Sequence, residues 1–105
     1  TSQCKAFLDR CVMFRRNGFL FKNMVGGAIA VGGFRNGGQG TTIQQVHASM
    51  LVQDMIIVGD GAPGAHFGGA MWSGQQDGIE GDKVGLQTVE NLGRRVAELA
   101  LRLDR

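Results

Sequence analysis

A glycine-rich stretch is the part of the sequence most suggestive of chemistry. Residues 31–42 hold five glycines between an apolar run and two threonines. Glycine permits positive φ and lets a ligand approach the main-chain N–H groups closely. Where such a loop leads into a helix, those N–H groups favour an anion or an electron-rich oxygen. The same composition also fits a tight turn without a ligand, and the local chemistry leaves both interpretations open.

The familiar phosphate-binding patterns do not fit this stretch. A P-loop requires Gly-Lys-Ser/Thr, and residues 31–42 contain no lysine. The dinucleotide pattern Gly-x-Gly-x-x-Gly also fails, because Gly38 and Gly40 are correctly spaced but position 43 is isoleucine. We therefore do not expect the stretch to be the main phosphate cradle.

Four other side chains are candidates for a role in binding. His47 lies on the apolar face of a predicted helix, where we expect a hydrogen-bonded core histidine. His66 and Trp72 lie in a long glycine-rich segment, where each can either approach a ligand or serve packing. Arg35 can pair with an anionic cofactor or remain solvated.

The carboxylates and thiols predict no catalytic group and no metal site. Asp77, Glu80 and Asp82 are expected to form a solvated rim, because their spacing does not make them converge on a metal ion. Cys4 and Cys11 would lie about 10 Å apart along one helix, which is too far for a disulfide. We expect both to be reduced core cysteines, which favours a cytoplasmic protein.

Hydrophobic spacing predicts the elements that position these residues. A helix is expected over residues 2–15, with a buried stripe made by Cys4, Phe7, Leu8, Cys11 and Val12. Further helices are expected over residues 41–53, capped by Thr41 or Thr42, and over residues 83–104. Uncharged apolar runs at residues 24–31 and 55–58 predict two buried strands of a parallel sheet. Residues 59–82 are expected to be a long loop.

Composition limits the classes of function. The chain has 105 residues, which is at most one domain, and a net charge of +2, which is too small to indicate binding to nucleic acid or membrane. Two parallel strands cannot bury both of their faces. We therefore expect that strands are missing, either upstream in a longer protein or in a partner chain. The order helix, strand, helix, strand, helix fits the C-terminal portion of an α/β, doubly wound parallel sheet, with its N-terminal strands missing.

Several stretches resemble the NADPH-dependent FMN reductase group, which includes iron-sulfur flavoproteins and the tryptophan-repressor-binding-protein type of quinone reductase. Residues 1–10 are similar to the group's Ser-x-x-Leu-Lys-x-Phe-Leu-Asp-Arg helix start, and residues 37–42 to its Gly-Gly-Gln-Glu-Thr-Thr. Residues 53–59 resemble its Gly-Met-x-Val-Val-Gly strand, and residues 91–100 its final Leu-Gly-x-Arg-Val-Ala-Glu helix. These matches span nearly the whole chain, in the order and spacing of the C-terminal half of a flavodoxin-like fold.

The resemblance implies FMN as the cofactor and NAD(P)H as the electron donor. By position, the residues beside the flavin ring would be Val31, Gly32, Gly33, Phe34, Arg35, Asn36 and Gly37. Electrons would pass to a quinone or another small-molecule acceptor, and a homo-dimer or homo-tetramer is expected. The group usually has Glu where this chain has Gly40, so a contact at the helix N-terminus is expected to be lost.

Two alternative functions remain open. One is a flavodoxin-like electron carrier without substrate turnover. The other is a cofactor-free module that completes its sheet with another chain. Reduction of bound flavin by NADPH distinguishes the enzyme from both alternatives.

Overall fold

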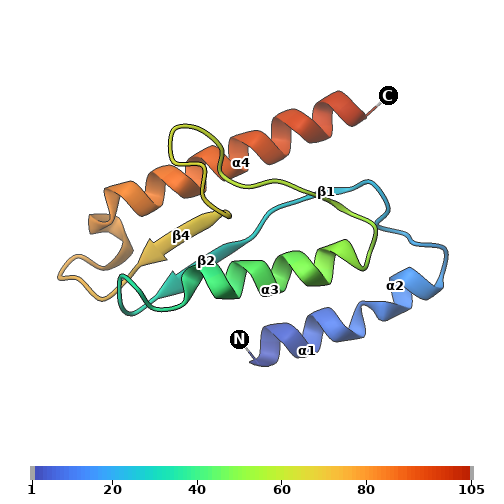
Figure 1. Cartoon of the computed structure of the whole chain (residues 1–105), viewed down its shortest axis with the longest axis horizontal. Coiled ribbons are helices and arrows are strands. Elements are labelled where there is room, and N and C mark those ends of the chain that lie inside the picture. Colours follow the sequence, from blue (N-terminus) through green and yellow to red (C-terminus); the bar gives the residue numbers. More distant parts are fainter. Residues whose placement is uncertain (1, 105) are drawn as a thin grey trace.

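The computed structural model describes residues 2–104, and helices alternate with short strands along the chain (Figure 1). The elements are α1 (Ser2–Arg10), α2 (Val12–Arg16), β1 (Val25–Gly26), β2 (Ile29–Gly32), α3 (Gln39–Leu51), β3 (Ile56–Ile57), β4 (Gly69–Trp72), a 3₁₀ helix (Gly78–Gly81) and α4 (Lys83–Leu103). The predicted helices over residues 41–53 and 83–104 are confirmed to within two residues.

The strands form two small parallel sheets rather than one. β1 pairs with β3, and β2 pairs with β4, both in parallel. The strand predicted over residues 24–31 is therefore interrupted at Gly27 and Ala28. A Cβ at position 27 would lie 2.7 Å from the Leu92 side chain, so α4 approaches the backbone closely at this break.

The sequence analysis missed β4, which it placed inside a loop. This strand has only four residues and begins with glycine and alanine, so its local β propensity is weak. It forms because Gly69–Trp72 pairs in register with Ile29–Gly32, far upstream in the sequence. The prediction of one long loop over residues 59–82 is therefore wrong for Gly69–Trp72.

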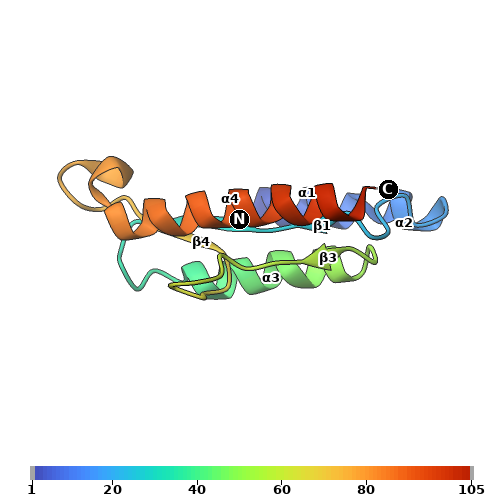
Figure 2. The ribbon, with the colours of Figure 1, turned by 90° about the horizontal axis from the view of Figure 1, so that it is seen from above.

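Helices cover both sides of the strands. Figure 2 shows α3 and α4 on opposite sides of the strand layer. The core cluster consists of Ala28, Ala30, Ile43 and Met50, and lies between the strands and α3. On the other face of β2, Ile29 and Val31 remain 52% and 51% exposed. The described residues therefore bury only one face of β2.

The two outer edges of the β2–β4 pair differ. On the β4 edge, the Ala70 N–H donates to Thr88 Oγ1 at 3.0 Å, and the Trp72 N–H donates to Asp82 Oδ2 at 2.8 Å. On β2, Ala28 and Gly32 direct their carbonyls toward β4. Because successive residues of a strand alternate, the backbone groups of Ile29 and Val31 point away, to an edge with no paired strand among residues 2–104. One edge is closed by side chains, and the other is open.

The N-terminal helix differs from the prediction. The chain forms two helices that meet at Cys11, and of the predicted stripe only Cys11 is buried, whereas Phe7 is 66% exposed. The expected burial of Cys4 is also wrong, although both thiols are free. The physical reason is that α1 lies beside α3 and has no strand layer beneath it in the described part of the chain (Figure 1).

Among the described residues, no helix is both long enough and apolar enough to cross a membrane.

Candidate functional site

The glycine-rich loop, residues 33–38, follows the carboxyl end of β2 and is organised by the side chain of Gln39. This first residue of α3 is 8% exposed. Its Oε1 accepts from the Gly37 N–H at 2.9 Å, and its Nε2 donates to the carbonyls of Phe34 at 2.8 Å and Met71 at 3.1 Å. One carboxamide therefore ties the loop to itself and to β4.

Close packing explains Gly32, at the end of β2, and Gly37, and backbone conformation explains Gly38. A Cβ at Gly32 would lie 2.5 Å from Gln39 Nε2, and one at Gly37 would lie 2.9 Å from the Phe34 carbonyl oxygen. Gly38 caps α3 with a φ of 86°, a conformation that side chains disfavour. The predicted caps Thr41 and Thr42 are wrong, because both lie inside the helix.

Gly33 is the glycine of the loop that neither close packing nor a positive φ explains. A Cβ there would meet nothing within 4 Å, and its φ is not in the left-handed region. Neither packing within residues 2–104 nor backbone strain explains a glycine at this position. It is the position at which a close ligand approach would explain the residue.

The loop offers free hydrogen-bond donors. The N–H groups of Phe34, Arg35 and Asn36 have no partner within residues 2–104. The adjacent N-terminus of α3 has no capping side chain and no acidic residue in its first turn. Free N–H groups beside an uncompensated helix dipole attract an electron-rich group.

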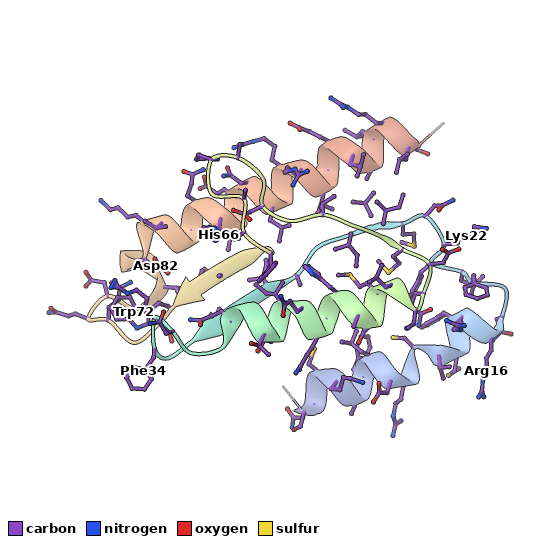
Figure 3. The ribbon with its side chains drawn as sticks, in the orientation of Figure 1. Arg16, Lys22, Phe34, His66, Trp72 and Asp82 are labelled. Atoms are coloured by element: carbon purple, nitrogen blue, oxygen red, sulfur yellow. The ribbon has the colours of Figure 1, made fainter. Side chains whose placement is uncertain are left out.

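The seven residues predicted to contact a cofactor are consecutive, and four of them line one or the other of two hollows. Val31 and Gly37 line a hollow of about 330 Å³ between α1, α3 and the open edge of β2. Arg35 and Asn36 line a groove of about 1,030 Å³ that runs along the closed edge of β4, between α3 and α4. Phe34 is 79% exposed at the tip of the loop (Figure 3).

Trp72 and Asp82 close the β4 side of the loop. The Trp72 indole N–H donates to the Gly33 carbonyl at 3.2 Å. Asp82 caps α4 by accepting from the Gly85 N–H at 2.9 Å, while its other oxygen accepts from the Trp72 N–H. The prediction that Asp82 is part of a solvated rim is wrong, whereas Asp77 and Glu80 are exposed as expected.

The two histidines have different environments. His47 is half-buried, and its Nε2 has no partner within residues 2–104. The prediction of a core histidine with a hydrogen bond is therefore wrong for the hydrogen bond of Nε2. Burial lowers the pKa of His47 below its usual value of 6.5, because the charged form is poorly solvated there. His66 is exposed and faces the buried carboxylate of Asp60.

Sequence reasoning overlooked Gln39 and misread Asp82. Gln39 could have been found from its place between a double glycine and the helix, where a long amide can fold back onto the loop. Asp82 stands immediately before a helix pattern, a position at which Asp commonly caps. Within residues 2–104, no three His, Cys, Asp or Glu side chains come together in a metal-binding arrangement.

Comparison with known proteins places this geometry in context. The profile of the NADPH-dependent FMN reductase family matches residues 1–70. The chain is 48% identical to an iron-sulfur flavoprotein of Methanocaldococcus jannaschii, over 94% of this chain and 51% of the relative. It is 44% identical to an iron-sulfur flavoprotein of Methanosarcina thermophila, over 93% of this chain and 48% of the relative. The chain thus spans about half the length of these relatives. No solved structure matches at a significant level.

Proposed function

The chain belongs to the NADPH-dependent FMN reductase family, and from this premise we propose that it forms part of a flavin-dependent oxidoreductase. FMN would supply the hydride and electron transfer when bound. NAD(P)H is the proposed donor, and a quinone or another small molecule the proposed acceptor. The observation that carries the proposal is the loop of residues 33–38, with its free N–H groups and its unexplained Gly33.

The loop residues would hold and polarise the flavin. The main-chain N–H groups of Phe34, Arg35 and Asn36 can donate to the electron-rich pyrimidine edge of the ring. The Arg35 side chain lines the groove on the β4 side, so it adds positive charge to the loop without contacting a ring on the open-edge side. Gly33 lets the ring approach the backbone, because no side chain stands in the way. Gln39 acts indirectly by binding the Phe34 carbonyl and the Gly37 N–H, which fixes the loop and leaves the N–H groups between these two residues free.

The ring is proposed to lie on the open-edge side of the loop. The β4 side is closed by the Trp72 indole and by Asp82, whereas the β2 side leads into the hollow lined by Val31 and Gly37. Ligands of open α/β sheets bind at the carboxyl ends of strands, between neighbouring strand–helix connections. A further strand beside β2 would supply the second wall of such a crevice.

We also propose that residues 1–105 are the C-terminal part of a flavodoxin-like, doubly wound domain. Three observations support this proposal: the open edge of β2, the exposed Ile29 and Val31, and the exposed apolar face of α1. The hollow between α1, α3 and β2 is where an additional strand would add. The flavin phosphate would then be held outside residues 1–105, since the glycine loop lacks a phosphate-binding pattern.

An iron-sulfur cluster does not fit the described residues. Such clusters are usually held by four cysteine thiolates. This chain has two cysteines, of which Cys4 is exposed and Cys11 is buried with its thiol directed to the Phe7 carbonyl. Residues 2–104 therefore do not hold an iron-sulfur cluster by themselves.

A spectroscopic experiment tests the flavin proposal. The intact protein should show a flavin band near roughly 450 nm, and anaerobic NADPH should bleach it. Gly33→Ala should weaken FMN binding at least several-fold without changing the melting temperature. Gly40→Ala is the matched control, because its Cβ would make only an ordinary 3.5 Å contact with the Phe67 ring.

Each other outcome of this experiment points to a different function. Flavin that binds but is not reduced by NADH or NADPH would favour an electron carrier. A protein that takes up no added FMN would overturn the proposal and favour a cofactor-free module. The acceptor, the choice between NADH and NADPH, the cytoplasmic location and the homo-oligomer stay predictions.

A further inference from the structure

Asp60 is a buried carboxylate with no hydrogen-bond partner. It follows β3, is 1% exposed, and neither Oδ1 nor Oδ2 is hydrogen-bonded within residues 2–104. A carboxylate that is buried without a hydrogen-bond donor loses the solvation that stabilises its charged form. A hydrogen-bond donor that reached this carboxylate would therefore stabilise the fold.

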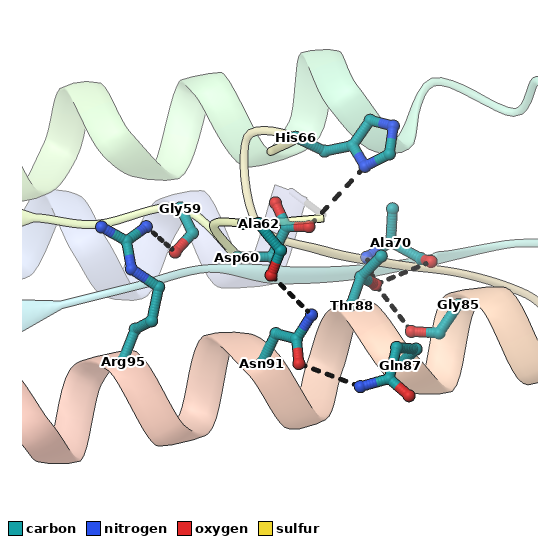
Figure 4. A network of polar contacts seen from close by, with 10 residues as sticks. All are labelled: Gly59, Asp60, Ala62, His66, Ala70, Gly85, Gln87, Thr88, Asn91 and Arg95. Carbon is teal, nitrogen blue, oxygen red and sulfur yellow. Dashed lines mark hydrogen bonds and ion pairs between the residues drawn. The ribbon is translucent and has the colours of Figure 1, made fainter. Parts of the chain in front are cut away.

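The chain supplies one available donor, His66. Its Nδ1 lies 3.7 Å from Asp60 Oδ2, just beyond hydrogen-bonding distance, and its side chain is 63% exposed (Figure 4). The other nearby donors are engaged: Arg95 donates to the Gly59 carbonyl at 2.8 Å, and Asn91 donates to the Ala62 carbonyl at 3.4 Å. Among the basic side chains of residues 2–104, the imidazole is the one that forms an ion-pair contact with this carboxylate.

We propose that His66 and Asp60 form a protonation-dependent clasp that fastens the loop of residues 61–66 against α4. When the imidazole is charged, it closes the short gap and makes a charge-assisted hydrogen bond to the buried carboxylate. When it is neutral, the charge attraction is lost and the loop loosens. Histidine is the side chain that makes this change between about pH 5 and 8.

The clasp also shapes the groove beside β4. His66 lines both that groove and a separate hollow of about 260 Å³ between the loop and α4. Closing the clasp turns the imidazole toward Asp60 and away from the groove. The end of the groove next to Phe67 would therefore be wider at low pH than at high pH.

The other charged groups around His66 do not account for a change in this pH range. Lys83 from α4 lines both hollows, Arg95 from α4 lies against Gly61, and Arg35 and Asp82 line the far part of the groove. Lysine and arginine do not titrate between about pH 5.5 and 8. The residues of α3 that line the groove, such as Thr41 and Gln44, are uncharged.

Amide hydrogen exchange tests the clasp in the intact protein. The Ala65 N–H is a suitable probe, because it is bonded within the loop to the Gly61 carbonyl. After correction for intrinsic exchange rates, its protection should be several-fold greater at pH 5.5 than at pH 8. Asp60→Asn should abolish this difference, because the charge on residue 60 is lost. His47→Gln should keep the difference, since that histidine lies outside the clasp.

Equal pH dependence in the wild type and in Asp60→Asn would overturn the clasp, as would equal protection of the wild-type loop at the two pH values. If Asp60→Asn does not fold, the His66→Gln variant tests the clasp in its place. Its amide can donate to Asp60 but cannot gain a charge, so loop protection should become independent of pH. Protection that still rises at low pH in His66→Gln would contradict the proposal.

Discussion

At the start of α3, the carboxamide of Gln39 decides the shape of the glycine loop. It accepts one N–H and donates to two carbonyls, and it lies where a side chain on Gly32 would otherwise be. The loop is therefore held by an internal contact, and its remaining N–H groups are left free for a ligand. The chemistry of the side-chain amide matters here more than its size.

Gln39→Glu should destabilise the protein by about 2–4 kcal/mol. The substitution keeps an acceptor for the Gly37 N–H but replaces the donor to Phe34 and Met71 with a carboxylate oxygen that repels both carbonyls. Chemical denaturation measures the loss. Gln44→Glu, an exposed change on the same helix, should alter stability by no more than about 0.5 kcal/mol. Equal stability of the wild type and Gln39→Glu would refute this role.

His47 should make stability depend on pH. Its pKa is lower in the folded state than in the unfolded chain, because burial disfavours the charged form. As the pH falls below about 6.5, the unfolded chain binds the proton and the folded chain does not, so stability is lost. His47→Gln should therefore flatten the decline in unfolding free energy between about pH 7 and 5. A slope equal to that of the wild type would contradict the assignment.

At the scale of elements, Asp82 joins the start of α4 to the end of β4. One oxygen caps the helix at Gly85 and the other accepts from the Trp72 N–H on the edge of the strand. Thr88, six residues further along, accepts a hydrogen bond from the Ala70 N–H of the same strand edge. The helix thus provides the hydrogen bonds that another strand would otherwise make, which closes this edge of the sheet.

Asp82→Ala should cost about 2–4 kcal/mol, since it removes a helix cap and leaves a strand N–H unpaired. Thermal unfolding in the wild type and the variant measures this cost. Asp77→Ala is the matched control: Asp77 is exposed and makes no side-chain capping bond to the 3₁₀ helix that follows it. We expect the control to stay within about 0.5 kcal/mol of the wild type. A similar loss in both variants would argue against the link between helix and strand.

At the scale of the whole molecule, few apolar side chains are buried and many are exposed, which supports the proposal that further strands complete this domain. Among residues 2–104, eight hydrophobic residues are buried and seventeen large ones are exposed, including Ile29 and Val31 beside the open edge of β2. The Cα atoms span 46 × 32 × 17 Å, so the molecule is flat. A thin slab cannot bury apolar residues on all of its faces.

Amide exchange can test whether β2 is an internal strand of a larger sheet. In residues 1–105 expressed alone, the Val31 N–H should exchange rapidly, whereas the Ala70 N–H, bonded to Thr88, should be protected. In a longer protein that carries the preceding strands, the Val31 N–H should become protected at least tenfold, because a neighbouring strand would pair with it. Rapid exchange at Val31 in both proteins would show that this edge remains open.

The sequence by itself determined the α/β class, the parallel strands, two of the helices and the family. Periodic apolar spacing and the ordered motifs of residues 37–42 and 91–100 are local properties, so they could be read directly. Only the tertiary structure decided the existence of β4, the exposure of Cys4, the hydrogen bond from Gln39 to the Met71 carbonyl and the burial of Asp60. Each of these depends on groups distant in the sequence: β4 forms because β2 presents a free edge, and α1 stays exposed because no strand of residues 2–104 lies beneath it.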